Sequence, residues 1–264
     1  MCKDCGCSLG GEHTHEHSHG GYSHSHAHSH EHGEGHDHSH EHANPALGET
    51  KTVEVIQKIL GENDHEAEHV RAHLDEHGIL CVNLMSSPGA GKTTLLEATI
   101  KSGAFKIGVV EGDLETNRDA DRIIKAGGEG YQITTGQTCH LDAFMVHEGL
   151  HHINLNDKDI VFIENVGNLV CPASYDVGAH LNAVLLSVPE GSDKVEKYPV
   201  MFRRADVVLI TKTSLLPYFD FSVEDVKKSV RRLNPKADII EIDSAKGEGL
   251  DKWLNYLKMK KEFR

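Results

Sequence analysis

The sequence lacks any run of about eighteen consecutive apolar residues, the length that a helix needs to cross a membrane. Its N-terminus also lacks the apolar segment of a secretory signal peptide. These two absences argue against a membrane-spanning protein and a membrane partner. They predict a location in the cytoplasm.

Basic residues are in deficit. The 264 residues include 27 lysines and arginines against 41 aspartates and glutamates, which gives a formal net charge of −14. Because nucleic-acid-binding proteins present a basic face to the phosphate backbone, this balance argues against a nucleic-acid partner. An acidic surface instead tolerates cations. The length suffices for one sizeable α/β domain with extensions, and nothing forces a second compact domain.

Cysteine is sparse, and half of it is concentrated at one place. Of the six cysteines, three lie within the first seven residues, at Cys2, Cys5 and Cys7. In a reducing compartment, a C-x-x-C-x-C arrangement favours metal ligation over a disulfide framework. Thiolates at this spacing, with the nearby α-amino group as a fourth donor, suit square-planar Ni²⁺ or tetrahedral Zn²⁺. The alternative is a redox pair or an incidental thiol cluster.

The segment from His13 to His42 contains almost nothing apolar. It holds thirteen of the 22 histidines, mostly alternating with small or acidic residues. Such a segment cannot bury a core and is predicted to be disordered. Neutral imidazole binds Ni²⁺, Zn²⁺ and Cu²⁺, so the tract is expected to hold several ions, each more weakly than a dedicated site would. Residues 1–49 are therefore assigned to a metal-binding tail.

Residues 50–78 have helical periodicity and are assigned to a connector. Their apolar residues predict one or two amphipathic helices, with a break at 61–64 as one option. Histidines recur every four residues along one helix face, at His65, His69, His73 and His77. A solvated polar stripe is the simpler interpretation of this spacing. The alternative is a secondary metal site between the tail and the domain.

The remaining residues, 79–264, are assigned to one domain in which strand-like and helix-like segments alternate. Apolar runs occur at 79–85, 106–111, 131–134, 159–164, 182–188, 206–211 and 238–242. The alternation predicts an α/β fold with a doubly wound, mainly parallel sheet. Such sheets bind ligands at the carboxyl ends of their strands, so the residues that directly follow each strand are the candidate site.

The first strand is followed by a glycine-rich turn and then by a predicted helix. The turn reads S-S-P-G-A-G-K-T-T and is close to the G-x-x-x-x-G-K-[ST] phosphate loop, with Ser86 in place of the first glycine. Backbone N–H groups of such a turn cradle phosphate at the helix N-terminus. Lys92 would reach the β- and γ-phosphates, and Thr93 would hold Mg²⁺. The nucleotide-binding residues predicted here are Pro88, Gly89, Ala90, Gly91, Lys92, Thr93 and Thr94.

Carboxylates end two of the later strands. Asp113 ends the sequence E-G-D, where it could hold Mg²⁺ or the attacking water, although a helix N-cap would have the same appearance. Glu164 begins E-N-V-G, which resembles the D-x-x-G switch of GTPases with glutamate in place of aspartate. The amide of Gly167 would approach the γ-phosphate. The candidate catalytic residues are Lys92, Asp113 and Glu164, and both carboxylates are candidate Mg²⁺ ligands.

Two cysteines and a histidine lie on either side of this switch, at Cys139, His140 and Cys171. Neighbours in sequence seldom direct both side chains at one ion, so Cys139 and His140 would need Cys171 or a second chain. Buried thiols without a metal are the alternative. Their position beside the switch favours a metal site.

A base-binding motif is incomplete. Residues 211–214 read T-K-T-S at the place where GTPases carry N-K-x-D. The stem of Lys212 can still cover the base, but Ser214 offers a hydroxyl where the motif has a carboxylate that accepts two hydrogen bonds from guanine. Base discrimination is therefore expected to suffer. Ser244, Ala245 and Lys246 match the S-A-K element, whose backbone reads guanine O6.

The motifs together resemble the HypB family of hydrogenase maturation GTPases over nearly the whole chain. The resemblance is carried by M-C-x-x-C-G-C at 1–7, the His-rich tract, L-M-S-S-P-G-A-G-K-T-T at 84–94, E-G-D at 111–113, C-H-L-D-A at 139–143, F-I-E-N-V-G-N-L-V-C-P-A at 162–173 and S-A-K-G-E-G-L-D-K-W-L at 244–254. It implies the SIMIBI class of P-loop NTPase fold, hydrolysis of GTP with Mg²⁺, and a homodimer linked to the nucleotide.

The resemblance also implies two metal sites and two partners. A Ni²⁺ or Zn²⁺ site would lie at Cys139, His140 and Cys171, and a nickel site at Cys2, Cys5 and Cys7. The expected partners are a HypA-type metallochaperone and the precursor of the hydrogenase large subunit, into which nickel would be inserted. The alternatives are a nickel or zinc storage protein with a vestigial NTPase domain and a UreG-like urease nickel GTPase. The C-x-x-C-G-C start and the loop through Cys171 argue against the second.

Overall fold

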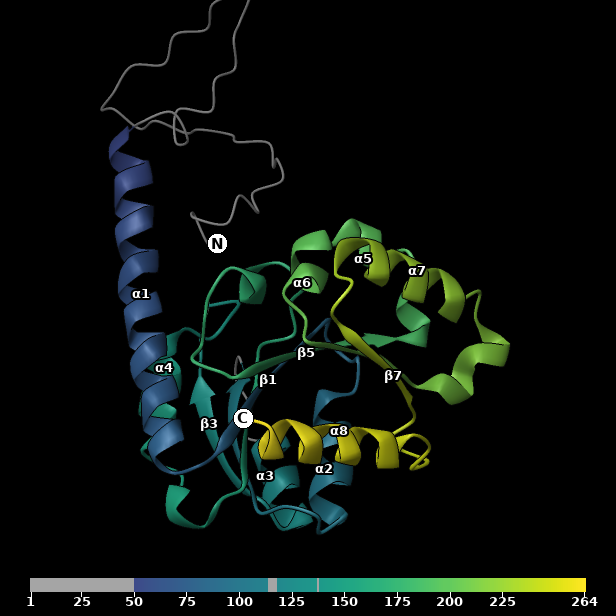
Figure 1. The fold of residues 1–264 in the computed structure, drawn as a ribbon, viewed down its shortest axis with the longest axis horizontal. Helices are drawn as coiled ribbons and strands as arrows, with labels where there is room; N and C mark the ends of the chain where they lie inside the picture. Colours follow the sequence, from purple (N-terminus) through teal and green to yellow (C-terminus); the bar gives the residue numbers. More distant parts are fainter. Residues whose placement is uncertain (1–49, 114–117, 137) are drawn as a thin grey trace, which may run out of the picture.

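The computed structural model describes residues 50–113, 118–136 and 138–264 (Figure 1). The three N-terminal cysteines and the His-rich tract lie outside the described residues. The side chain of Asp113 also lies outside them, although the backbone of this residue ends a strand.

A seven-stranded sheet forms the centre of the domain, and all of its strand pairs are parallel. The strand order is β3-β2-β4-β1-β5-β6-β7. The strands are β1 Leu80–Ser86, β2 Ile107–Asp113, β3 Glu129–Thr134, β4 Ile160–Glu164, β5 Leu181–Ser187, β6 Val207–Thr211 and β7 Asp238–Ile242. They coincide with the seven predicted runs apart from small shifts at the ends, because strands buried on both faces are continuous apolar runs. The predicted doubly wound sheet is confirmed.

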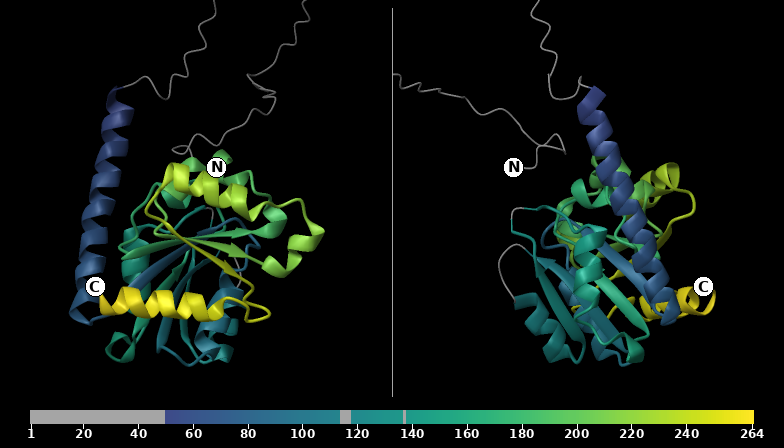
Figure 2. Two further views of the ribbon diagram at one scale, coloured as in Figure 1. Left: turned by 45° about the vertical axis from the view of Figure 1, so that its right-hand side comes forward. Right: turned by 90° about the vertical axis from the view of Figure 1, so that its left-hand side faces the viewer.

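Helices cover both faces of the sheet (Figures 1 and 2). One face packs against α2, α3 and α8; the other packs against α1 and α4 at one end and α5, α6 and α7 at the other. The helices are α1 Thr50–Glu76, α2 Lys92–Lys101, α3 Arg118–Ala126, α4 Ala143–Leu150, α5 Lys194–Lys197, α6 Pro199–Arg203, α7 Val223–Leu233 and α8 Leu250–Glu262. Short 3-10 turns are η1 Leu155–Asp157, η2 Cys171–Ala173, η3 Val188–Glu190 and η4 Thr213–Tyr218.

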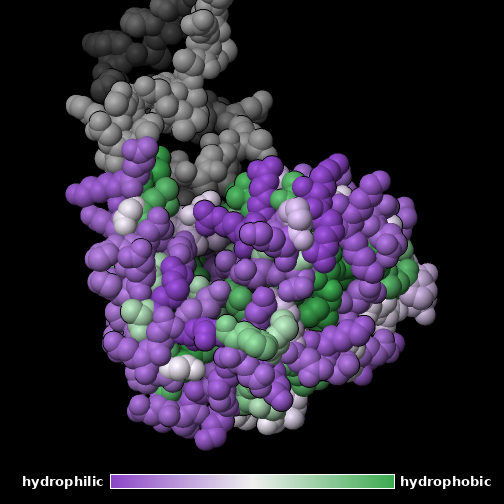
Figure 3. All heavy atoms as spheres, in the orientation of Figure 1, coloured by the Kyte–Doolittle hydropathy of each residue, from purple (hydrophilic) through white to green (hydrophobic). Residues whose placement is uncertain are grey.

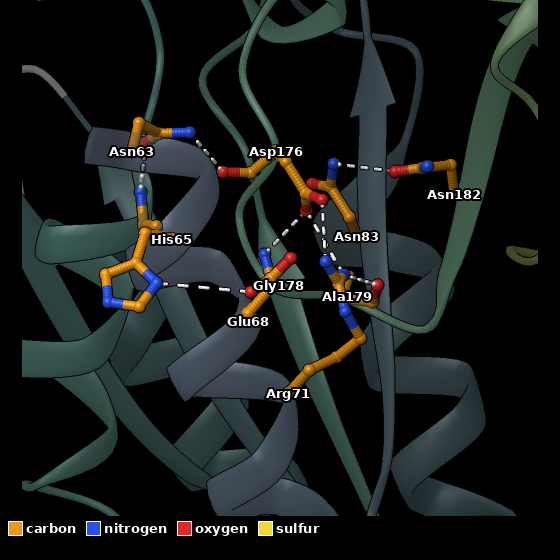
Figure 4. A network of polar contacts seen from close by, with 10 residues as sticks. Asn63, His65, Glu68, Arg71, Asn83, Asp176, Gly178, Ala179 and Asn182 are labelled. Atoms are coloured by element: carbon orange, nitrogen blue, oxygen red, sulfur yellow. Dashed lines mark hydrogen bonds and ion pairs between the residues drawn. The ribbon is translucent and has the colours of Figure 1, made fainter. Parts of the chain in front are cut away.

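The connector forms one continuous helix, α1, and residues 61–64 do not interrupt it. Asn63 is almost fully buried, and its side chain bonds to other elements of the domain. Its Nδ2 donates to the backbone oxygen of Asp176 at 2.8 Å, and its Oδ1 accepts from the backbone N–H of Ala143 at 2.9 Å (Figure 4). These contacts replace the local side-chain-to-backbone bonds by which asparagine usually opposes a helix.

An ion pair also holds α1 against the domain (Figure 4). Arg71 donates to both carboxylate oxygens of Asp176, at 3.2 and 2.7 Å, and to the backbone oxygen of Ala179 at 2.8 Å. Gly178 lies in the left-handed region at φ 78°, and a Cβ on it would lie 2.5 Å from the side chain of Val70. Only glycine therefore lets this loop approach the helix so closely. The division between residues 50–78 and 79–264 stays a prediction.

The face drawn in Figure 3 is mostly hydrophilic, with apolar residues in small patches. Among the described residues, the exposed large apolar side chains include Tyr218, Phe219 and Phe263. Within the same residues, no helix combines the length and apolar character that a membrane span requires.

Candidate functional site

The turn between β1 and α2 lines an open cleft of about 420 Å³ at the carboxyl ends of the strands. Gly89 and Gly91 have φ values of 74° and 103°, in the left-handed region that favours glycine. Gly91 is the N-cap of α2, so the first N–H groups of that helix are available to a phosphate. The predicted residues that line this cleft are Pro88, Gly89, Gly91, Lys92, Thr93, Thr94, Glu164, Gly167 and Lys212.

Lys92 is held inside the phosphate loop. Its side chain is buried, and its Nζ donates to the Oγ of Ser86 at 3.1 Å. Burial lowers the pKa of Lys92, while the nearby carboxylate of Glu164 opposes that shift. Ser86, which replaces the first glycine of the motif, therefore supplies a hydroxyl that orients the lysine. Serine at position 86, where the motif has glycine, therefore keeps the Lys92 ammonium beside the phosphate loop.

Glu164 lies beside Thr93. Its Oε1 accepts from the Thr93 hydroxyl at 2.9 Å, and its Oε2 is buried without a hydrogen-bond partner among the described residues. Burial raises the pKa of Glu164 to about 7, against the opposing effect of Lys92. A carboxylate oxygen with open lone pairs beside a hydroxyl fits a hard divalent cation such as Mg²⁺.

A second carboxylate, that of Glu111, was not among the predicted site residues. It is buried, lines the same cleft and pairs in register with Glu164 across β2 and β4. Its position in E-G-D, two residues before Asp113, was the available signal. The backbone of Asp113 pairs with Thr134 at the end of β2.

The switch loop after β4 packs directly on the phosphate loop. A Cβ added to Gly167 would lie 2.9 Å from the backbone N and Cα of Pro88. Real Cβ atoms do not approach backbone this closely, so position 167 requires glycine. The loop that contains Gly167 therefore lies against the turn that is predicted to bind phosphate.

A second cavity, of about 270 Å³, adjoins the phosphate loop. Lys212 lines both cavities, and its Nζ donates to the backbone oxygen of Gly89 at 2.7 Å. The Thr211 hydroxyl donates to the backbone oxygen of Ala90, also at 2.7 Å. The remaining predicted residues that line the second cavity are Ala90, Ser214, Ser244, Ala245 and Lys246. The structure thus brings the T-K-T-S and S-A-K loops together beside the phosphate loop.

A carboxylate does lie at this second cavity, and it comes from the other loop. Asp243, at the end of β7, is buried, and its Oδ2 accepts from the Ser214 hydroxyl at 2.5 Å and from the Ser214 N–H at 3.2 Å. Burial acts to raise the pKa of Asp243, but hydrogen bonds from Ser214, Lys246 and Ala245 outweigh it and lower the pKa. The sequence interpretation missed this residue, although it directly precedes S-A-K.

The three candidate soft ligands converge. One ligand atom from each of Cys139, His140 and Cys171 lies within 4.8 Å of the other two. Cys139 Sγ and His140 Nδ1 are 3.8 Å apart, and the imidazole stacks on Tyr175 with ring centroids 3.9 Å apart. Burial lowers the pKa of His140, which keeps its ring neutral and able to ligate. No second chain is needed to bring these three groups together.

One buried amide lies between the cleft and this cluster. Asn165 lines the cleft directly after Glu164, and its Oδ1 accepts from the backbone N–H of Leu141 at 3.1 Å. Leu141 directly follows His140 in the chain. In the sequence, Asn165 lies within the E-N-V-G motif, and no role was predicted for it.

The sequence is similar to those of known proteins over most of its length. The family model described as the CobW/HypB/UreG nucleotide-binding domain matches residues 80–241. The hydrogenase/urease maturation factor HypB of Helicobacter pylori (strain ATCC 700392 / 26695) is 47% identical over 222 residues, which cover 83% of this chain and 91% of the relative. The hydrogenase maturation factor HypB of Escherichia coli (strain K12) is 45% identical over 215 residues, which cover 81% and 74%.

Two solved structures are similar throughout the domain. HypB from Helicobacter pylori in complex with nickel aligns with a TM-score of 0.75 at 47% identity, over 76% of this chain and 95% of that chain. HypB from Archaeoglobus fulgidus aligns with a TM-score of 0.71 at 40% identity, over 76% and 100%.

Proposed function

This chain belongs to the HypB family of P-loop GTPases, and from that premise we propose that it is a nickel metallochaperone that helps insert Ni²⁺ into the precursor of the [NiFe]-hydrogenase large subunit. It hydrolyses GTP to GDP and phosphate with Mg²⁺, as a factor for metalloenzyme maturation. The observation that carries the nickel proposal is the convergence of two thiols and an imidazole directly beside the nucleotide switch.

We assign the phosphate chemistry to residues of the cleft. The backbone N–H groups of residues 89–94 and the ammonium of Lys92 hold the phosphates. Thr93 and Glu164, with Asp113, are the proposed ligands of Mg²⁺, which supplies positive charge to the phosphate oxygens when it is bound. Gly167 lets the switch loop contact the γ-phosphate, and water attacks that phosphate to release GDP.

Guanine selectivity is assigned to Ser214 and Asp243 together. Because the Ser214 hydroxyl donates its proton to the carboxylate of Asp243, its lone pairs remain free to act as acceptors. Those lone pairs would accept from the N1 and N2 groups of guanine, in place of the missing aspartate. The backbone at Ala245 and the stem of Lys212 complete the proposed base site.

Cys139, His140 and Cys171 are the proposed ligands of the transported ion. Two thiolates and one imidazole suit Ni²⁺ and Zn²⁺, and the three groups leave at least one coordination position open for transfer. Ni²⁺ or Zn²⁺ at Cys2, Cys5 and Cys7 is likewise proposed, from the spacing of those residues alone. Hydrolysis would alter the ion's affinity through Asn165, provided that the ion binds the two nucleotide states differently.

The proposed partners are a HypA-type metallochaperone, the hydrogenase precursor and a second copy of this chain. The proposed location is the cytoplasm. A second candidate is delivery of nickel to urease, since the Helicobacter pylori relative is described as a hydrogenase/urease maturation factor. Deletion of the gene separates the two, because a hydrogenase factor affects hydrogenase activity alone and a shared factor affects both enzymes.

Lys92→Ala tests the proposal against a metal buffer with a vestigial NTPase domain. We expect this variant to lose GTP hydrolysis and hydrogenase activation together while it still binds Ni²⁺. Lys101→Ala, at the exposed end of the same helix, is the matched control and should retain both activities. Hydrogenase activation that persisted in Lys92→Ala would favour the buffer.

A further inference from the structure

We propose that His73, His147 and His151 form a second metal site, which binds one borderline divalent cation such as Zn²⁺ between α1 and α4. The site is separate from Cys139, His140 and Cys171. It does not rest on the proposed role in nickel insertion.

The three imidazoles come from two helices that pack side by side (Figure 1). His147 and His151 are one turn apart on α4 and its C-cap, with ring centroids 5.1 Å apart and nearly parallel rings. His73 of α1 lies across from them, with its centroid 6.1 Å from that of His147 and 6.4 Å from that of His151. A polar stripe on α1 alone would not place two more imidazoles on the facing helix.

These separations are close to those that a metal requires. Rings bound tetrahedrally at a metal–nitrogen distance of about 2.1 Å have centroids about 5 Å apart. The possible ligand atoms of these three rings lie farther apart than those of Cys139, His140 and Cys171. His73 is partly exposed and His151 is exposed, so rotation of these two rings about χ1 and χ2 can close the remaining distance to His147.

The surroundings of His147 favour ligation. Its Nδ1 pairs with the carboxylate of Glu66, whose side chain is only 16% exposed. An Nδ1–H that donates to a carboxylate fixes the ring's tautomer and leaves the lone pair on Nε2. Metal-binding histidines in proteins commonly have such a carboxylate behind them. Glu66 therefore acts as a positioning residue in the proposed site.

His77 is the candidate for a fourth ligand. Its Nδ1 lies 3.0 Å from the backbone oxygen of His73, and the two ring centroids are 5.0 Å apart. Donation to that carbonyl leaves the Nε2 of His77 with a lone pair, as in His147. The same bond also satisfies a carbonyl in the last turn of α1, so this ring alone would not indicate a metal.

The position of the site in the fold separates it from the cysteine cluster. α4 begins at Ala143, directly after the segment Cys139–Asp142, and ends at Leu150 beside His151. The two metal groups would therefore lie near opposite ends of a helix about 12 Å long. A cation at the histidine site would also join α1 to α4.

Carbethoxylation of histidine, mapped by mass spectrometry on the full chain, tests the site residue by residue. In buffered free Zn²⁺, we expect His73, His147 and His151 to become protected with one shared midpoint. His147→Gln should raise the midpoint for the other two at least tenfold. Glu66→Gln keeps all three ligands and should raise it by about 10- to 100-fold, as loss of a ligand's hydrogen-bond partner typically does.

His152→Gln is the matched control. His152 is adjacent in sequence, but its ring stacks on Tyr131 at 3.9 Å and so lies outside the three-ring group. Its replacement should leave the shared midpoint unchanged, and circular dichroism should show equal helix content in all variants. Separate midpoints for the three rings, or midpoints unmoved by His147→Gln, would overturn the proposal. Modified histidines of residues 13–42 are detected on different peptides and therefore do not interfere with the measurement.

Discussion

The side-chain oxygen of Asn165 accepts a hydrogen bond from the backbone N–H of Leu141 at 3.1 Å. Asn165 follows Glu164 at the end of β4, and Leu141 follows Cys139 and His140, two of the proposed metal ligands. Both Asn165 and Leu141 are buried. A movement of the loop at Asn165 would therefore act directly on the backbone that carries two of the three proposed metal ligands.

Asn165→Ala should uncouple the metal from the nucleotide. Coupling between two sites is typically 5- to 150-fold in affinity, and we expect the ratio of Ni²⁺ affinities with GTP analogue and with GDP to fall toward one. Loss of the acceptor also leaves two buried N–H groups unpaired, those of Leu141 and Val166, at a cost of about 1–3 kcal/mol each in stability. The measurement is competitive Ni²⁺ titration in each nucleotide state, restricted to the component that Cys171→Ser removes.

Asn182→Ala is the control for that experiment. Asn182 belongs to the same chain of amides, because it accepts from Asn83 at 3.1 Å, and Asn83 in turn accepts from Asn165 at 3.3 Å. It does not contact Leu141, so its replacement should leave the affinity ratio unchanged. A wild-type ratio in Asn165→Ala would show that the coupling, if present, runs elsewhere.

Cys171→Ser should weaken binding at the three-ligand cluster at least tenfold, because a hydroxyl is a poor substitute for a thiolate toward Ni²⁺ or Zn²⁺. Cys81→Ala is the matched control. Cys81 is also fully buried, but burial raises the pKa of its thiol and it lies outside the cluster, so its replacement should not change metal affinity. Equal losses in the two variants would contradict the assignment of Cys171.

Features that depend only on residues adjacent in the sequence were predicted well. The phosphate loop is one contiguous motif, and each buried strand is one apolar run. Features that depend on pairs distant in the chain were not. The continuity of α1 rests on Asn63, whose partners are 80 and 113 residues away. The pairing of Glu66 with His147 likewise requires α1 and α4 to pack together first.

The base site shows the same limit. The sequence indicates a missing carboxylate at Ser214, but the carboxylate beside Ser214 comes from Asp243, 29 residues later. The two residues come together only because β6 and β7 pair as neighbouring parallel strands. A motif comparison within one loop cannot detect a charge that the next loop provides.

Asp243→Asn should lower the preference for GTP over ITP, which lacks the 2-amino group. Without the carboxylate, the Ser214 hydroxyl is no longer held as an acceptor, and one hydrogen bond to the base is worth about 1 kcal/mol. The ratio of kcat/KM for GTP and ITP should therefore fall about fivefold. Glu241→Gln is the control, since Glu241, two residues earlier on β7, pairs with Lys227 at 2.9 Å and lies outside the cavity. An unchanged ratio in Asp243→Asn would exclude this role.

His180 should make the folded domain sensitive to acid. Its Nδ1 accepts from the backbone N–H of Cys81 at 2.8 Å, which requires a neutral ring. Burial lowers the pKa of His180 from 6.5 to about 4, and the charge of Arg71 adds to this shift.

Below pH 6.5 the unfolded chain therefore takes up a proton at this ring while the folded chain does not. The contribution of His180 to the free energy of unfolding is complete above pH 6.5 and is lost as the pH falls toward 4. Between pH 7 and pH 5 the loss should be about 2 kcal/mol. Urea unfolding at the two pH values measures it.

His180→Asn isolates this effect, because asparagine keeps an acceptor for the Cys81 N–H and does not titrate. The contributions of all other residues are common to both proteins and cancel in the comparison. The variant should lose about 2 kcal/mol less than the wild type between pH 7 and pH 5. Equal losses of unfolding free energy in the two proteins would show that the acid sensitivity arises at other groups and not at His180.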